Sequence, residues 1–334
     1  NPLMSGFFKP LLRRVVFLRT PEFAANYLEP LLQEGVPIVA VFTGEDAVSA
    51  RGNKRVAPPV KQTALQYGVP VFQPRQINRG EGFESLARYQ PDLILLIAYG
   101  KLLREPALEL PRYGAYNLHP SLLPRYRGAA PIQRCLLNGD NETGVCLMKM
   151  SLALDEGPVA RSVTMPVSAD QTYSGLVHQM RETALPMLLD FLRGFDPATV
   201  HLTEQDPAQE LSYAAKVEKE EWEVRWADSS QAVHNRIRAF DADPLARTAY
   251  KGVTVKLAGS RLYDGPEEKP PASASSKPTP GTILDITKQG ARIACGMGSV
   301  IVGRIQFPGK SLISTYQATQ GRLLSLGERF EGPI

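Results

Sequence analysis

The chain has 334 residues and 43% of them are hydrophobic, which predicts about two domains with a sizeable core. The formal net charge of +4 is mildly basic and gives only weak support for a polyanionic partner. Three cysteines without metal or redox spacing exclude a disulfide framework, and no apolar run has the length of a membrane span, so we expect a protein of a reducing, cytoplasmic compartment without membrane association.

The first half of the chain alternates apolar strand candidates with helical stretches. Residues 1–14 are basic and contain no acid, so an organelle matrix is the alternative location if they are the remnant of a leader. Strands are expected at Val15–Leu18, Val36–Phe42, Val69–Phe72 and Asp92–Ala98, and helices from Pro21 toward Leu32 with a kink or break at Pro30, at 60–67 and at 82–89. This alternation predicts a parallel sheet with helices on both faces.

Three further strands and a long helix complete this domain. The strands are expected at Gly114–Leu118, Thr143–Met150 and Pro158–Pro166, and the amphipathic helix at Thr172–Leu192. The predicted fold class is therefore α/β, with a doubly wound, mostly parallel, Rossmann-like sheet over residues 15–195.

The strand and helix rhythm stops after residue 195. Residues 196–214 are polar, contain two prolines and are predicted to be a linker. A helix near Gln231–Phe240 and five short strands with glycine turns follow, which predicts a small, OB-like β-barrel domain over residues 215–330. Residues 266–279 (PEEKPPASASSKPT) read as a flexible surface insertion.

The stretch NLHPSLLPRYRGAAPIQ, residues 117–133, follows a predicted strand and is unlike a scaffold segment. Ligands of open parallel sheets bind outside the carboxyl ends of the strands, which is where Asn117 and His119 are expected. Asp155, in the turn LDEGPV between two strands, is expected at the same rim. An isolated Asn-x-His or Asp-x-Gly is usually structural, so only their convergence indicates a site.

These three side chains suit one kind of chemistry. Asn117 and His119 can donate hydrogen bonds to an oxygen that becomes negative, and Asp155 can orient the imidazole and favour its charged form. No Ser or Cys is placed as a nucleophile. The pattern therefore favours direct transfer of an acyl group to an amine over a covalent acyl-enzyme.

The 117–133 motif together with LDEGP resembles the formyltetrahydrofolate-dependent formyltransferases. TPEFAANYLEPLL, the 51–74 segment, AYGKLL and the late PGTI also match, so the resemblance covers residues 15–330. It implies 10-formyltetrahydrofolate as co-substrate and Asn117, His119 and Asp155 as the catalytic residues. It also implies two folate-contacting segments, namely Ser121, Leu122, Leu123 and Pro124, and a pterin-pocket wall of Ala98, Tyr99 and Gly100.

Two basic stretches favour an initiator methionyl-tRNA substrate within that resemblance. Residues 47–80 contain six basic residues and no acid, with Arg51, Lys54 and Arg55 at a predicted loop tip that is expected to bind tRNA. Residues 286–327, within the predicted barrel, contain five basic residues and no acid. The alternatives are a sugar-nucleotide amine as acceptor, hydrolysis of 10-formyltetrahydrofolate, and an RNA-binding protein whose site has decayed.

Two departures from the family pattern stand near the expected site. Arg19 replaces a glycine in Phe-x-Gly-Thr-Pro, which would strain the turn if that glycine had a positive φ. Asp241-Ala-Asp-Pro follows Phe240 where the family tends to have Asn-Pro-Trp-Pro. We find no phosphate-binding loop and no metal-ligand spacing, so we expect no metal or nucleotide cofactor, and we expect a monomer.

Overall fold

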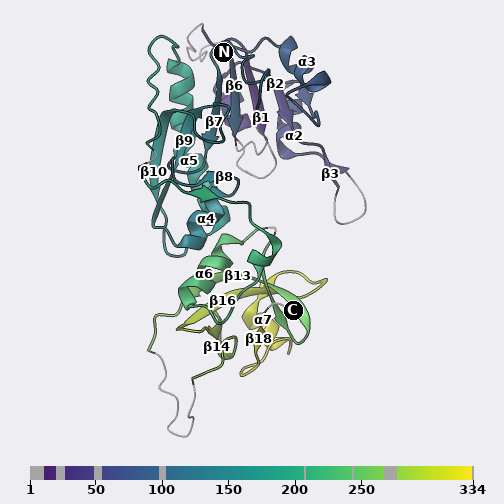
Figure 1. Cartoon of the computed structure of the whole chain (residues 1–334). Coiled ribbons are helices and arrows are strands. Elements are labelled where there is room, and N and C mark those ends of the chain that lie inside the picture. Colours follow the sequence, from purple (N-terminus) through teal and green to yellow (C-terminus); the bar gives the residue numbers. More distant parts are fainter. Residues whose placement is uncertain are drawn as a thin grey trace, which may run out of the picture. The chain divides into compact units, whose positions relative to one another are not determined.

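The structure is a computed structural model that describes residues 11–19, 27–48, 55–97, 103–206, 208–242, 244–266 and 277–332 (Figure 1). The described chain forms two compact units that are not consecutive in sequence. The first unit comprises the residues up to Pro131, Glu142–Met165 and Val177–Ala215, and the second comprises Ile132–Asn141, Pro166–Leu176 and the residues from Lys216 onward. Residues 196–214, predicted as a linker, thus lie within the first unit, and the division at 15–195, 196–214 and 215–330 stays a prediction.

A seven-stranded sheet forms the centre of the first unit, as the α/β prediction requires. Its order is β10-β9-β7-β6-β1-β2-β5, with β1 at Val15–Arg19, β2 at Ile38–Thr43, β5 at Val71–Phe72, β6 at Leu93–Ile97, β7 at Ala115–His119, β9 at Glu142–Lys149 and β10 at Val159–Pro166. The pairs β1–β2, β1–β6, β2–β5 and β6–β7 are parallel, whereas β9 is antiparallel to β7. All five residues of β6 are buried, as expected of a central strand covered on both faces.

Helices α1 (Leu28–Gln33), α2 (Pro59–Gln66) and α3 (Gly80–Arg88) join these strands, and α5 (Tyr173–Gly194) follows β10. The predicted break at Pro30 is wrong: α1 begins at Leu28, so Pro30 lies in the first turn, where a backbone N–H needs no helical partner. The expected earlier start of this helix, at 21–26, lies outside the described residues. Helix α5 packs on β7, with the rings of Phe191 and Tyr116 5.1 Å apart.

The second unit contains an antiparallel sheet that curls into a half-barrel, in agreement with the predicted barrel class (Figure 1). Its order is β14-β15-β16-β13-β12-β18, with β17 paired to β16. The strands are β12 (Ala246–Tyr250), β13 (Val253–Leu262), β14 (Ile283–Thr287), β15 (Gly290–Ala294), β16 (Ser299–Gln306), β17 (Ile313–Ser314) and β18 (Phe330–Glu331), and the helices are α6 (Ser230–Ala239) and α7 (Thr315–Gln320).

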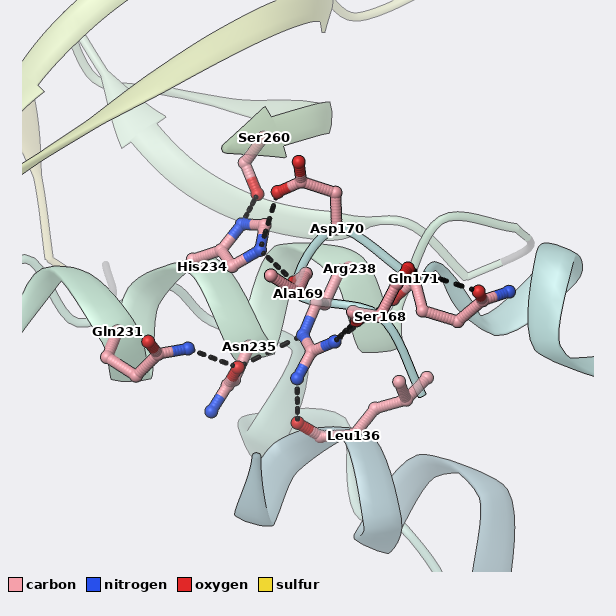
Figure 2. A network of polar contacts seen from close by, with 10 residues as sticks. All are labelled: Leu136, Ser168, Ala169, Asp170, Gln171, Gln231, His234, Asn235, Arg238 and Ser260. Carbon is pink, nitrogen blue, oxygen red and sulfur yellow. Dashed lines mark hydrogen bonds and ion pairs between the residues drawn. The ribbon is translucent and has the colours of Figure 1, made fainter. Parts of the chain in front are cut away.

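A buried polar network ties two earlier segments of the chain to α6 (Figure 2). Arg238, only 3% exposed, donates from Nη1 to the Ser168 and Gln171 carbonyls at 3.1 and 3.3 Å and from Nη2 to the Leu136 carbonyl at 3.5 Å. Leu136 belongs to α4 (Pro131–Asn138), which sequence analysis missed. Side chains of α6 thus bind both α4 and the connection that precedes α5.

Candidate active site

Strand β7 presents two polar side chains on one face at its carboxyl end. Asn117 and His119 are two residues apart, so the strand period of two places both side chains on the same side of the sheet. They are 6% and 4% exposed. The Asn117 Oδ1 atom is buried and has no hydrogen-bond partner among the described residues. A buried amide oxygen without a protein partner is uncommon, so this group is a candidate for binding a ligand or water.

The imidazole of His119 lies between a backbone carbonyl and a carboxylate. Its Nε2 donates to the carbonyl of Tyr126 at 2.9 Å, because a carbonyl oxygen only accepts. Its Nδ1 faces Oδ2 of Asp155 at 3.8 Å. Nδ1 is therefore the ring nitrogen that remains for a substrate.

Asp155 reaches His119 by a route that differs from the one expected. Because β9 is antiparallel to β7, its last residue, Lys149, pairs with Tyr116 and lies toward the other end of β7. The connection 150–158 must fold back to bring Asp155 to His119. Asp155 has φ +53°, and its Oδ2 accepts from the backbone N–H of Gly128 at 2.8 Å.

Two glycines permit this close packing. A Cβ on Gly157 would lie 1.8 Å from the carbonyl oxygen of Lys149, so no other residue fits there without movement of the backbone. Gly128 has φ +113°, and a Cβ there would lie 2.9 Å from the carbonyl oxygen of Ala214. The first approach packs the Asp155 connection against the end of β9, and the second packs the loop that follows β7 against Ala214.

The expected folate-contacting segment follows His119 directly. Ser121 is buried, and its hydroxyl donates to the carbonyl of Arg125 at 2.6 Å. Leu122 and Leu123 are half-buried, and Pro124 is buried. Ala98, Tyr99 and Gly100, the other expected wall, lie outside the described residues, so their placement stays a prediction.

Sequence analysis missed the contribution of the 203–214 stretch. Thr203 pairs with Val159, and Gln205 bonds to both Arg127 and the Asp155 connection. Farther along, β11 (Tyr213–Ala214) pairs in parallel with β8 (Arg127–Gly128). The polar composition that predicted a linker gave no signal for these contacts.

The expected tRNA-binding tip falls largely on residues that the structure does not describe. Arg51 and Lys54 lie outside the described residues, and of Arg55 only the backbone is described. It begins β4 (Arg55–Val56), which pairs in an antiparallel manner with β3 (Ala47–Val48). At the base of this hairpin, Nζ of Lys61 binds both carboxylate oxygens of Asp46 at 2.9 and 3.0 Å.

The two departures have structural explanations. Arg19 is the last residue of β1 and pairs with Thr43 and Ile97, so its backbone is extended and the expected turn strain is wrong. Asp241 accepts hydrogen bonds from the backbone N–H and the hydroxyl of Ser174, both at 3.0 Å, near the start of α5. Its carboxylate therefore stabilises the N-terminal end of that helix.

The described part of the chain contains neither a cluster of metal-ligand side chains nor a helix suited to a membrane. There, no three His, Cys, Asp or Glu side chains gather in a way that could hold a metal ion. None of the described helices combines the length and apolar character needed to cross a membrane.

A doubly wound sheet with buried Asn, His and Asp side chains at one strand end defines an α/β protein with a rim site. Comparison with known families then identifies the particular family of α/β proteins. Residues 13–192 match the family model described as formyl transferase, and residues 216–323 match the formyl transferase C-terminal domain. The chain belongs to the formyl transferase family.

Curated relatives agree with this assignment, and solved structures share the fold. The chain is 40% identical to the methionyl-tRNA formyltransferase of Kosmotoga olearia, covering 96% of this chain and 100% of the relative. It is 42% identical to the protein of that name from Thermotoga maritima, covering 95% and 98%. The HypX structure from Aquifex aeolicus in complex with tetrahydrofolic acid shares the fold, with TM-score 0.62 and 20% identity over 94% of this chain and 48% of HypX. WlaRD, a sugar 3N-formyl transferase, gives TM-score 0.61 and 16% identity over 90% and 99%.

Proposed function

We propose that the protein transfers the formyl group of 10-formyltetrahydrofolate to the amino group of initiator methionyl-tRNA. Support comes from the curated relatives, which carry the name methionyl-tRNA formyltransferase and match over nearly the whole chain. The match extends through the C-terminal family model, which covers residues 216–323. A sugar-nucleotide amine as the acceptor is the rival that the acceptor test below separates.

The observation that carries the proposal is the pair of free hydrogen-bonding groups on one face of β7. The Asn117 carboxamide has an Oδ1 without a hydrogen-bond partner among the described residues, and its Nδ2 is the atom that can donate to a substrate oxygen. Nδ1 of His119 faces the carboxylate of Asp155 at 3.8 Å. Both side chains are nearly buried, so hydrogen bonds to a substrate oxygen are strengthened by the low local dielectric.

The proposed chemistry is direct transfer. The methionine nitrogen attacks the formyl carbon, and negative charge grows on the formyl oxygen, which accepts from Asn117 and from Nδ1 of His119. The Asp155 carboxylate, 3.8 Å from Nδ1, compensates the positive charge of the imidazolium. The new carbon–nitrogen bond replaces the bond to the folate nitrogen, the proton released by the amine passes through water to that folate nitrogen, and tetrahydrofolate departs.

The remaining contacts are assigned by position. The co-substrate is proposed to lie along Ser121, Leu122, Leu123 and Pro124 and against Ala98, Tyr99 and Gly100. The acceptor end of the tRNA is proposed to meet Arg51, Lys54 and Arg55. A cytoplasmic location and a monomeric state stay predictions.

The direct test is incubation of the protein with 10-formyltetrahydrofolate and charged initiator methionyl-tRNA. Formylmethionyl-tRNA is the expected product, and uncharged tRNA and aminosugar nucleotides are the controls. Turnover of an aminosugar nucleotide with none of methionyl-tRNA would overturn the acceptor assignment, and release of free formate alone would indicate a hydrolase.

Replacement of His119 by alanine removes one of the two proposed oxyanion donors. We expect kcat to fall at least ~100-fold while the melting temperature changes little, because the lost hydrogen bond is strongest in the transition state. The matched control is His178→Ala on the exposed side of α5, which should keep wild-type turnover. Near-normal turnover of His119→Ala would remove this histidine from the mechanism.

A further inference from the structure

We propose that Gln205 is a positioning residue for this reaction, and that its side-chain amide holds the 150–158 connection so that the Asp155 carboxylate stays beside His119. The inference rests on the proposed function, in which Asp155 compensates the charge of His119. Gln205 lies in a stretch whose composition predicted only a linker, about 50 residues along the chain from Asp155.

The amide of Gln205 makes four hydrogen bonds that join two parts of the site. Its Nε2 donates to the carbonyl oxygens of Asp155 and Gly157, both at 2.8 Å. Its Oε1 accepts from Nε and Nη2 of Arg127 at 3.1 and 2.8 Å. Two donors and two acceptor positions are all that a carboxamide has, so this side chain is fully used.

These partners fix the orientation of the amide. The guanidinium of Arg127 only donates, and the two carbonyls only accept. If the side-chain amide rotated by half a turn, its NH2 group would face the N–H donors of Arg127. Its oxygen would then face the carbonyl oxygens of Asp155 and Gly157. Gln205 is therefore held in one orientation and in turn fixes the two carbonyls.

Arg127 holds the Gln205 amide in place. It is 5% exposed and lies in β8, which pairs with β11. Its Nη1 also binds Oε1 of Glu156 at 3.2 Å, so the guanidinium contacts the same connection a second time. A buried guanidinium that loses its acceptor is costly, which resists movement of the amide.

The 150–158 connection needs this contact because β9, the strand that precedes it, does not hold it near His119. Strand β9 ends beside Tyr116, so residues 150–158 have to fold back to His119. Asp155 has φ +53°, a conformation that a residue with a side chain rarely adopts. Neighbouring groups must stabilise this conformation, and Gln205 binds the carbonyl of Asp155 itself.

The test compares Gln205→Glu with Asp155→Asn and with the double variant. Glutamate has the same shape and keeps an oxygen for Arg127, but its second oxygen meets the carbonyls of Asp155 and Gly157 without a proton. We expect kcat to fall about 10- to 100-fold with KM for both substrates within about 2-fold, since misplacement of a catalytic group acts on the transition state. Glu204→Gln, an exposed neighbour in the same segment, is the matched control and should behave as wild type.

The double variant distinguishes positioning from general damage. If Gln205 acts through Asp155, adding Gln205→Glu to Asp155→Asn should lower kcat by no more than about 3-fold further, whereas independent effects multiply. A second readout does not depend on activity: amide hydrogen exchange over residues 150–158 should be faster in Gln205→Glu than in wild type. If Gln205→Glu does not fold, Gln205→Met, which removes all four bonds with similar shape, replaces it.

Normal kcat, multiplicative losses or unchanged exchange over 150–158 would each overturn the inference. These outcomes are separate from failure of the proposed function. That failure would appear as wild-type protein that does not formylate methionyl-tRNA, and the exchange measurement would still decide whether Gln205 holds the connection.

Discussion

Two buried histidines, His119 and His234, have similar surroundings but differ in the partner of Nδ1. In both His119 and His234, Nε2 donates to a backbone carbonyl, of Tyr126 at 2.9 Å and of Ala169 at 2.8 Å. The Nδ1 of His234 is bound by the hydroxyl of Ser260 at 2.8 Å, whereas Nδ1 of His119 faces a carboxylate at 3.8 Å (Figure 2 shows His234). Both ring nitrogens of His234 are therefore hydrogen-bonded within the core, whereas Nδ1 of His119 is available to a ligand.

The burial of His234 leads to a prediction about how stability depends on pH. Burial, together with the nearby charge of Arg238, lowers the pKa of His234, while the Ala169 carbonyl and Asp170 oppose this effect. As pH falls through about 6.5, the unfolded chain binds a proton that folded His234 does not, so the folded state loses stability. We expect the wild type to be less stable at pH 5.5 than at pH 7.5 in urea unfolding.

The variant His234→Gln isolates this contribution. Its side-chain amide can still donate to the Ala169 carbonyl, but it does not titrate. The difference in unfolding free energy between the two pH values should be smaller in this variant than in wild type. The exposed His201→Gln serves as control and should keep the wild-type difference. Equal pH dependence in His234→Gln and wild type would contradict the assignment.

Hydrophobic periodicity predicted the long elements well. The strands β1, β6, β7, β9 and β10 and the helix α5 lie within two residues of their expected bounds, because continuous apolar runs and amphipathic spacing reflect burial directly. The two-residue strands β8 and β11 were missed, since only tertiary pairing stabilises such short segments.

For the candidate site, the motif predicted Asn117 and His119 at a strand end. The folding-back of the Asp155 connection and the role of Gln205 depend on contacts between distant segments, which a local pattern does not contain.

Helix α6 holds α4 and the connection before α5 through several side chains, of which Arg238 contacts both segments. The guanidinium of Arg238 donates to three backbone carbonyls and to Oδ1 of Asn235. Replacing it with methionine keeps most of the apolar stem but removes all four hydrogen bonds. The Ser168 and Leu136 carbonyls and Oδ1 of Asn235 keep a second donor, from Gln171 N, Gly139 N and Gln231 Nε2. The loss is therefore that of the bonds to a charged donor, each of which contributes about 1.5–3 kcal/mol.

We therefore expect Arg238→Met to lower the free energy of unfolding by roughly 3 kcal/mol or more, measured by urea unfolding. The control is Arg181→Met, which removes a surface ion pair with Glu182 and should change the free energy by less than about 1 kcal/mol. Similar small losses in both variants would show that the hydrogen bonds of Arg238 contribute little to stability.

At the scale of the whole chain, the two compact units interleave in sequence. Two segments from the first 180 residues, Ile132–Asn141 and Pro166–Leu176, belong to the unit that otherwise begins at Lys216. The change in composition after residue 195 marks where the sheet pattern stops. A local pattern does not contain the interleaving, because the burial of α4 depends on residues far along the chain.

Truncation after Ala215 tests whether this interleaving matters for stability. The truncated chain would keep α4 and Pro166–Leu176 but lose the part of their unit that begins at Lys216. We expect this to expose Ile132, Cys135 and Leu136, which are at most 3% exposed in the full chain. Exposing three such side chains costs roughly 4–9 kcal/mol, which corresponds to a fall in melting temperature of about 10 °C or more. We expect residues 1–215 to melt at least that far below the full chain and to bind a dye that reports exposed apolar surface. Adding residues 216–334 as a separate chain should restore part of the melting temperature. A fragment 1–215 that melts like the full chain, without dye binding, would show that the first 215 residues are stable independently of the second unit.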